Sequence, residues 1–416
     1  MHIRSAILAA ALAIGASHAH ADIALIGRAS IPGSARDKSG LADSVSAPGS
    51  TTKVPHDLLG GFGSAIDSLG RDNLYVACDD RGPGDGTIPW RCRFQTFRIL
   101  IAPGEPEPVK VELVSTTLLT DESGHPLDGV STGFNAERPL LAPRFDAEGI
   151  RLTHAGTLLI SDEYGPWIDE FSLAGRRLRR LPIPAKFQID HPSADPKAEL
   201  ASNSKGRDPN HGFEGLALSA DGKLATAILQ SPLIQDAVRT DKGKLKGVNL
   251  RMLQIVLATG ESRELVYRLE SPKHCVNELL AVDDHRFLAI ERDGLEARSR
   301  GLFLVDSSRA TDVSSIDPLP AALPDSIVPV SKTRWLDFMD PRWSLVGGSA
   351  AAKMPEKIEG LAFGPDLPDG RRTLIVTTDN DLRADEPSWF WVFAFAPGDL
   401  SPGAAPPSRP IPDHAP

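Results

Sequence analysis

The sequence predicts an all-β fold, and within that class a β-propeller of about five to six four-stranded blades. The chain of 416 residues contains 36 glycines and 35 prolines, which suits a turn-rich β protein better than a helical one. Few windows have the spacing of an amphipathic helix. A hairpin-like unit also recurs along the chain, and recurrence of short strands at regular intervals is typical of propellers.

The repeated unit is a predicted β-hairpin with a polar turn, and five copies are recognisable. Its first strand is expected in the segments GFGSAI, AEGIRL, FEGLAL, NELLAV and IEGLAF. Its second strand is expected in NLYVACDDRG, TLLISDEYG, LATAILQSP, RFLAIERDG and TLIVTTDND. Their short apolar runs are continuous or alternating, which is typical of strands. Further strand-like runs in several units predict four strands per blade, and the longer intervals leave room for a sixth blade.

The two ends of the repeat region fit a closed ring. The last unit supplies fewer strands than the others, whereas the segment DIALIGRASIP at residues 22–32 has no hairpin partner in the sequence. Pairing this strand into the final blade would close the ring and remove an exposed edge. We therefore expect one propeller domain over residues 22–396, closed by its N- and C-terminal strands. A polar insertion at residues 185–210 is expected to cover one face, and the Pro-rich tail at residues 397–416 is expected to be disordered.

The first 21 residues have the pattern of a secretory signal peptide. His2 and Arg4 precede an apolar run at residues 6–16, and Ala19 and Ala21 form a small-x-small cleavage pattern. Cleavage near Ala21 predicts an exported protein, located in the periplasm or outside the cell. The apolar run is too short for a membrane span, and no later run approaches the required length.

Acidic residues recur on the first strand of the hairpins. The first strand of a propeller blade lines the central channel, so we expect a ring of the carboxylates Glu148, Glu214, Glu278 and Glu359, with Ser64 in place of the acid in the first unit. Such carboxylates repel one another and titrate together unless a cation lies among them. Oxygen ligands of this kind suit Ca²⁺. Alternatively, each glutamate binds the backbone of a neighbouring blade and is purely structural.

A second acidic set follows the second strand of the hairpins: Asp79, Asp80, Asp162, Glu163, Glu291, Asp379 and Asp381. A single Asp after a strand often forms a turn through its own side chain. The paired acids in DDRGPG and DEYGPW are harder to explain as turns alone, and Asp79 and Asp379 are expected to add to the metal site. Basic residues beside these motifs are candidates for binding an anionic substrate, or else for salt bridges: Arg81, Arg138, His211, Arg292 and Lys357.

Charge and cysteine content narrow the functional classes. The net charge of −10 argues against a nucleic acid or an anionic membrane as partner. In an oxidising compartment Cys78 and Cys92 could form a disulfide, although free thiols remain equally possible, and Cys275 is expected to be a small buried residue. The motif GVSTG around Ser131 lacks the preceding strand and following helix of a nucleophile elbow, so no serine nucleophile is predicted.

Several motifs resemble one known family. The segments ISDEYGPWIDEFSLAG, NHGFEGLALSADGKL, ILQSPL and KIEGLAF, followed by TTDND, are similar to the phytase-like domain family, also described as esterase-like activity of phytase. The similarity covers roughly residues 60–395. It implies a secreted, propeller-like protein that hydrolyses phosphoesters. The chain lacks the DxxxDDPA and NNxD patterns of the Ca²⁺-dependent propeller phytases, and Ser64 and Gln230 replace acids of the repeat, so the resemblance supports the fold more firmly than phytate as substrate.

The expected function is metal-assisted hydrolysis of a small anionic phosphoester by a monomeric, calcium-binding propeller. The ring glutamates would hold Ca²⁺, and Asp162 or Glu163, together with Glu214, would act on the attacking water. Two alternatives stay open. One is a non-catalytic propeller that binds a ligand or partner, and the other is a Ca²⁺-dependent lactonase or carboxylesterase on the same scaffold.

Overall fold

The computed structural model describes residues 23–135, 142–294, 298–345 and 354–400. The predicted signal peptide, nearly all of the predicted tail and Arg138 lie outside the described residues. Within these ranges the chain folds into five four-stranded antiparallel sheets, and the innermost strands contact one another in a closed ring. The described residues therefore form a β-propeller of five blades, which confirms the predicted fold class.

Each blade has four strands, and in blades 1 to 4 they follow the order of the chain from the innermost to the outermost, whereas β1 is the outermost strand of blade 5. Blade 1 consists of β4 (Ala65–Ser68), β5 (Leu74–Cys78), β6 (Arg93–Ile101) and β7 (Val109–Leu118). Blade 2 consists of β8 (Ala147–Leu152), β9 (Leu158–Asp162), β10 (Trp167–Phe171) and β11 (Arg177–Arg180). Blade 3 consists of β12 (Phe213–Leu218), β13 (Leu224–Leu229), β16 (Asn249–Val256) and β17 (Ser262–Arg268). Blade 4 consists of β18 (His274–Ala281), β19 (Arg286–Asp293), β20 (Arg300–Asp306) and β21 (Ser331–Asp337). Blade 5 consists of β22 (Lys357–Phe363), β23 (Arg372–Asp379), β24 (Ser388–Phe395) and β1 (Ala24–Ile31).

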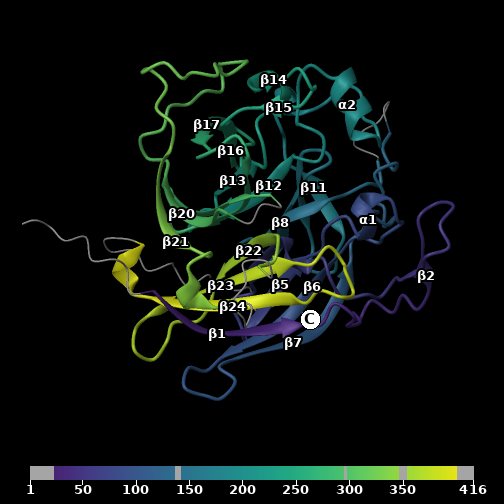
Figure 1. Ribbon diagram of the computed structural model, residues 1–416, viewed down its shortest axis with the longest axis vertical. Coiled ribbons are helices and arrows are strands. Elements are labelled where there is room, and N and C mark those ends of the chain that lie inside the picture. Colours follow the sequence, from purple (N-terminus) through teal and green to yellow (C-terminus); the bar gives the residue numbers. More distant parts are fainter. Residues whose placement is uncertain (1–22, 136–141, 295–297, 346–353, 401–416) are drawn as a thin grey trace, which may run out of the picture.

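The N-terminal strand closes the ring, as predicted. β1 pairs antiparallel with β24, from Ala24 opposite Ala394 to Ile31 opposite Ser388. Figure 1 shows β1 in purple beside β24 in yellow, although the two strands come from opposite ends of the described chain. This pairing covers the free edge that β24 would otherwise expose.

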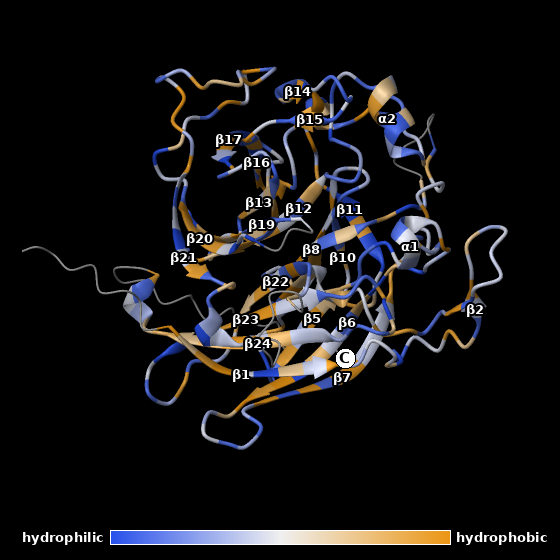
Figure 2. Ribbon diagram, in the orientation of Figure 1, coloured by the Kyte–Doolittle hydropathy of each residue, from blue (hydrophilic) through white to orange (hydrophobic). Residues whose placement is uncertain are grey.

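Buried apolar side chains lie between neighbouring blades. One cluster joins blades 4 and 5 through residues such as Leu288, Ile290, Trp391 and Phe393. Figure 2 shows that many strands contain hydrophobic stretches in orange, whereas many of the connecting loops are hydrophilic and blue. Because the apolar faces are used between blades, the polar residues at the strand ends remain available for the channel and its mouth.

Short elements lie in the connections outside the blade strands. They comprise two small hairpins, β2 (Ser44–Val45) with β3 (Val54–Pro55) and β14 (Val238–Arg239) with β15 (Leu245–Lys246), the helices α1 (Pro83–Gly86) and α2 (Pro196–Ser202), and 3-10 turns at Phe62–Ser64, Ala185–Phe187, Ile234–Asp236, Pro341–Trp343 and Pro397–Asp399. Among the described residues, neither α1 nor α2 has the length or the apolar character needed to cross a membrane.

The three cysteines are free thiols, so the disulfide considered between Cys78 and Cys92 is not formed. Both side chains are buried and face blade 2 instead of each other. The Sγ atom of Cys78 donates to the carbonyl oxygen of Ala147 at 3.6 Å, and that of Cys92 donates to Phe145 at 3.2 Å. Burial raises the pKa of both thiols, so they are neutral and unreactive.

Candidate functional site

A bulge on the innermost strand sets the position of the ring residues in four blades. The pairing with the second strand shifts at Glu148, at Glu214 and at Glu359. In blade 4 the shift falls on Asn277, between Val276 and Glu278. A bulge leaves its residue out of the ladder and re-aims its side chain. Asn277 therefore takes the ring position that the sequence assigned to Glu278.

Glu278 is used inside the propeller and does not reach the cavity described below. Its Oε2 atom lies 2.8 Å from Nη2 of Arg151, and both side chains are almost completely buried. The same guanidinium donates to the carbonyl oxygens of Ile66 at 2.8 Å and Leu279 at 3.0 Å. Burial raises the pKa of Glu278 to about 7, against the opposing effect of Arg151. This ion pair ties blades 1, 2 and 4 together through the centre of the molecule.

We expect Arg151→Met to destabilise the protein by about 3–5 kcal/mol, because it leaves the Glu278 carboxylate buried without its partner. Urea unfolding measures the change. Arg179→Met on the outermost strand of blade 2 is the matched control, since Arg179 is 50% exposed and pairs with Glu170 at 2.6 Å. The control substitution should lower the free energy of unfolding by only about 0–1 kcal/mol. Equal losses for the two variants would contradict a special role for the central pair.

A cavity of about 270 Å³, which we call the carboxylate cavity, is formed by the ring residues and the loops that follow the second strands. Its twelve lining residues include two basic ones, Arg81 and Lys357, and two amides, Asn210 and Gln230. The other eight are acidic: Asp80, Asp85, Glu148, Glu163, Glu214, Glu356, Glu359 and Asp381. Eight carboxylates against two cations leave an excess of negative charge in a confined space, which favours a bound cation.

Three buried carboxylates form a compact group at this cavity. One oxygen each of Asp80, Asp146 and Glu148 lies within 4.8 Å of the other two. Asp146 accepts from Nη1 of Arg81 at 2.8 Å. Glu148 is only 6% exposed, and no hydrogen bond or ion pair reaches its carboxylate from the part of the chain that the structure describes. A buried carboxylate is normally paired or bound to a metal. The group therefore fits a hard divalent cation such as Ca²⁺, which takes oxygen ligands.

Two further ring glutamates each present one unpaired oxygen. Oε1 of Glu214 accepts from Nδ2 of Asn277 and from Nε2 of Gln230, both at 2.7 Å. Oε1 of Glu359 accepts from Nη2 of Arg292 at 2.9 Å and from Asn277 at 3.2 Å. The Oε2 atom of each is buried and has no hydrogen-bond partner among the described residues. The donors thus hold each side chain in place and leave one oxygen available as a ligand.

The crowding of carboxylates is reflected in their pKa values. Burial, and next the charge of Glu214, raise the pKa of Glu148 well above its usual range. The pKa values of Asp146 and Glu214 are raised in the same way, by burial and then mainly by neighbouring acids, although Arg81 opposes the shift at Asp146. Asp80 differs. Burial would raise its pKa, but Lys357 and Arg81 outweigh that effect and lower it.

Lys357 already neutralises a second acidic group. Its Nζ atom lies 2.9 Å from Asp80, 3.1 Å from Asp379 and 2.6 Å from Asp381. Burial raises the pKa of Asp379 to about 8, against the effect of Lys357. Because this ammonium occupies the centre of the second group, the group around Glu148 is the better candidate for an added cation.

Two predicted site residues are turned away from the carboxylate cavity. Oδ1 of Asp162 accepts from the backbone nitrogens of Asp146 at 2.8 Å and Tyr164 at 3.2 Å, so this residue holds a turn. Asp79 accepts from Nε2 of Gln95 at 3.1 Å within blade 1. Side chains alternate along a strand. The second acid of each pair, Asp80 or Glu163, therefore faces the cavity in place of the first.

The remaining predicted residues are distributed around the site. Glu163 lines the cavity and lies 3.3 Å from Arg81. Arg292 pairs with Glu359, as described above. His211 is not among the lining residues, and its Nδ1 atom lies 3.3 Å from Oδ2 of Asp208.

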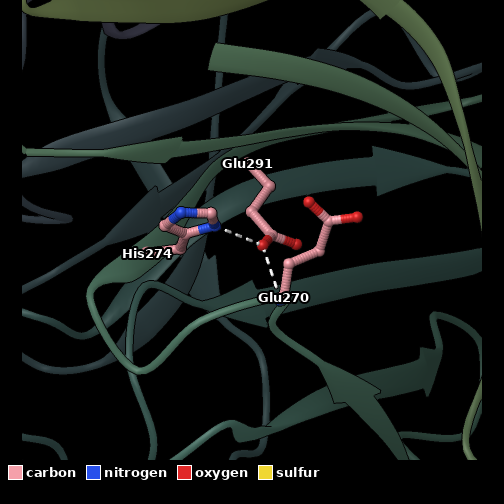
Figure 3. Close-up of side chains that lie close together, drawn as sticks. All are labelled: Glu270, His274 and Glu291. Atoms are coloured by element: carbon pink, nitrogen blue, oxygen red, sulfur yellow. Dashed lines mark hydrogen bonds and ion pairs between the residues drawn. The ribbon is translucent and has the colours of Figure 1, made fainter. Parts of the chain in front are cut away.

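Glu291 belongs to a separate cluster with Glu270 and His274, which Figure 3 shows in close-up. The carboxylate accepts from the backbone nitrogen of Glu270 and contacts Nδ1 of His274, both at 2.8 Å. It also accepts from Tyr267 at 2.8 Å and from Lys332. Burial would raise the pKa of Glu291, but the Lys332 ammonium lowers it. With donors already in place, this carboxylate has no need of a metal.

Sequence reasoning missed Asp146, which contributes to the compact group. The segment FDAEG carries the signal, because Asp146 lies two residues before the ring glutamate Glu148. Lys357 precedes Glu359 at the same spacing in blade 5. A search for acids two residues before each ring glutamate would have found Asp146.

The chain resembles proteins of known sequence and structure. An uncharacterized secreted protein of Arthroderma benhamiae is 28% identical over 278 residues, which covers 53% of this chain and 51% of the relative. The chain thus spans about half the length of that curated relative. Among solved structures, a gluconolactonase of Xanthomonas campestris has 11% identity and a TM-score of 0.34, covering 88% of this chain and 97% of that one. The Cps50 (Swd1) β-propeller domain of Myceliophteria thermophila has 8% identity and a TM-score of 0.28, covering 77% and 67%.

The fold assignment rests on the strand pairing described above, and family membership rests on sequence. The family model for phytase-like proteins, described as esterase-like activity of phytase, matches residues 57–382, which is most of the chain. The matched range contains the innermost strands of all five blades and both acidic groups of the cavity. The chain therefore belongs to the phytase-like family.

Proposed function

We propose that this protein is an exported hydrolase that cleaves phosphoesters with the help of a divalent cation, for which Ca²⁺ is the first candidate. One observation carries the proposal: Glu148 is buried without a partner among the described residues, beside Asp80 and Asp146, in a cavity with a large excess of carboxylates. Membership of the phytase-like family supports hydrolysis as the reaction class. The secreted relative supports export to the periplasm or the outside of the cell.

The residues of the cavity have separate parts in this proposal. Asp80, Asp146 and Glu148 would hold the cation, and the free oxygens of Glu214 and Glu359 are available as further ligands or as acceptors for its water. When bound, the cation would neutralise phosphate charge and lower the pKa of a bound water. Arg81 would hold an anionic substrate at the cavity.

Glu163 is the best placed general base. Its carboxylate lies at the cavity and is 2% exposed, beside Arg81. From this position it can orient the attacking water and accept its proton. A serine nucleophile is not required, because the proposed reaction is a direct attack of water on phosphorus. A small anionic phosphoester is therefore the proposed partner of the protein.

Phosphate release tests the proposed function. Purified protein in millimolar CaCl₂ should release phosphate from p-nitrophenyl phosphate or phytate, and EDTA should abolish the release, since the carboxylates repel the substrate without a cation. A short acyl ester and a lactone are assayed in parallel. Hydrolysis of those two compounds alone would replace phosphoesters by carboxylic esters as the substrate class. Calcium binding with no turnover of any compound would indicate a binding protein.

A further inference from the structure

Lys357, the first residue of β22, is surrounded by three carboxylates of the protein. Its Nζ atom donates to Asp80 at 2.9 Å and to Asp379 at 3.1 Å, and it forms an ion pair with Asp381 at 2.6 Å. Three carboxylates thus compete for the three N–H donors of one ammonium. Although Lys357 lines the carboxylate cavity, its charge is already balanced by the protein and is not free for an anionic substrate.

The three carboxylates around Lys357 have the spacing of a cation site. One oxygen of each lies within 4.8 Å of the other two, as in the group around Glu148. The side chains of Asp80 and Asp379 are 7% and 0% exposed, and that of Asp381 is 41% exposed. Calcium–oxygen bonds measure about 2.3–2.6 Å, which is only slightly shorter than the contacts of the ammonium. Lys357 therefore lies where the same oxygens could hold a metal ion.

The two acidic groups of the cavity share Asp80. Its Oδ2 atom accepts from Lys357 at 2.9 Å, and its Oδ1 atom accepts from the backbone nitrogen of Arg81. Lys357 thus fixes a carboxylate that also belongs to the group around Glu148. Hydrolases with two metal ions hold them about 3.5–4 Å apart in neighbouring sets of ligands. Here one of two neighbouring sets already contains a cation, and that cation is a side chain of the protein.

The repeat places a different charge at one position in two blades. Asp146 lies two residues before the ring glutamate of blade 2, and Lys357 lies two residues before the ring glutamate of blade 5. In blade 2 this position adds a carboxylate to the group around Glu148. In blade 5 it adds an ammonium to the neighbouring group. The two groups therefore differ in whether they still need a cation from solution.

We propose that Lys357 takes the place of a second metal ion, so that the centre binds one divalent cation and Lys357 acts as a positioning residue for Asp80. This inference rests on the proposed function, because that function assigns the divalent cation to the group around Glu148. The ammonium keeps Asp80 ionised and oriented before the divalent cation arrives, since a nearby positive charge favours the carboxylate. A single calcium ion then completes the centre.

The number of bound calcium ions tests the proposal. Equilibrium dialysis followed by elemental analysis should find one calcium ion per chain in wild-type protein. Lys357→Met nearly keeps the length of the side chain without its charge, and it should raise the number to two, because the three carboxylates then lack their cation. Adding Asp381→Asn to this variant should return the number to one. Lys186→Met is the matched control, since Lys186 is 15% exposed and pairs with Glu264 at 3.2 Å, and it should leave the number at one.

Two calcium ions in wild-type protein, or no additional ion in Lys357→Met, would overturn the proposal. A lysine with a merely structural role would lower the melting temperature when replaced, without adding a calcium ion. Calcium is present throughout the dialysis, so a variant that needs the ion for folding can still be measured. If Lys357→Met does not fold even in calcium, Asp381→Asn alone decides. It should keep one calcium ion with an affinity within twofold of wild type, and a tenfold loss of affinity would overturn the proposal.

Phosphate release separates this inference from the proposed function. One calcium ion in wild-type protein and two in Lys357→Met, with no hydrolysis of any phosphoester, would support the role of Lys357 and reject the proposed function. No calcium ion in wild-type protein and one in Lys357→Met would reject the group around Glu148 as the cation site. The role of Lys357 in place of a metal ion would still be supported by that result.

Discussion

Replacing Glu148 by glutamine is expected to stabilise the metal-free protein and to abolish its stabilisation by calcium. Glutamine has nearly the same shape but no charge, so the variant avoids burying a carboxylate without a partner. The expected gain in metal-free protein is about 1–3 kcal/mol. In wild-type protein, calcium at 100 times its dissociation constant should add about 2.7 kcal/mol, and the variant should lose this increment.

Thermal unfolding in EDTA and in calcium measures both effects, and phosphate release should fall at least 100-fold in the same variant. Glu112→Gln is the matched control, since this side chain is 68% exposed on β7 and pairs with the exposed Arg98. It should shift stability by less than about 0.5 kcal/mol. If Glu148 served only to bind a neighbouring blade, Glu148→Gln would lower the melting temperature with and without calcium, and that outcome would contradict a metal site.

The metal-free protein is expected to lose stability as the pH rises from about 4 to 8. The pKa values of Asp146, Glu148 and Glu214 are raised well above their ordinary range, and that of Asp379 is raised to about 8. The folded state therefore binds more protons than the unfolded state across this interval. Stability falls as the pH rises wherever the folded state binds more protons than the unfolded state. The contribution is fully present below about pH 4 and is lost as the pH passes the folded-state values.

Asp80 acts in the opposite direction, because its lowered pKa adds stability at neutral pH that is lost in acid. That loss falls below about pH 4, the ordinary pKa of an aspartate, so it does not offset the groups with raised pKa values, and the net slope between about pH 5 and 8 should be negative in EDTA. Urea midpoints at pH 5, 6.5 and 8 measure the slope. Calcium should flatten it, since a bound cation favours the ionised carboxylates. A rise in stability from pH 5 to 8 in EDTA would contradict this prediction, because other groups would then outweigh the carboxyl groups with raised pKa values.

The repeats made most of the fold predictable. Each blade has the same hairpin with the same apolar pattern, and the segment at residues 22–32 lacked a partner that only the last blade could supply. Strand pairing within a blade is local, so the sequence order of the strands is also their order in space. The exception is β1, whose partner is about 360 residues away along the chain, and here the need to cover an edge predicted the pairing.

The candidate site was only partly predictable, because it depends on register. A shift of one residue moves a side chain to the other face of a strand. Because of the bulge in blade 4, Asn277 lies at the ring position, and Glu278 pairs with Arg151. In the same way, the Asp162 side chain accepts a backbone hydrogen bond in a turn, whereas the next residue, Glu163, lines the cavity.

By itself, the sequence determined that this protein is a β-propeller of repeated hairpins, closed by its first strand, with an acidic residue at the channel in most blades. Those features follow from local apolar patterns. Only the tertiary structure decided which acids have partners. Lys357 occupies one acidic group and Arg207 pairs with Glu199, whereas Glu148 has no hydrogen bond or ion pair among the described residues. Pairing between residues so distant along the chain depends on how the blades pack, and that packing brings the carboxylates of several blades together in one cavity.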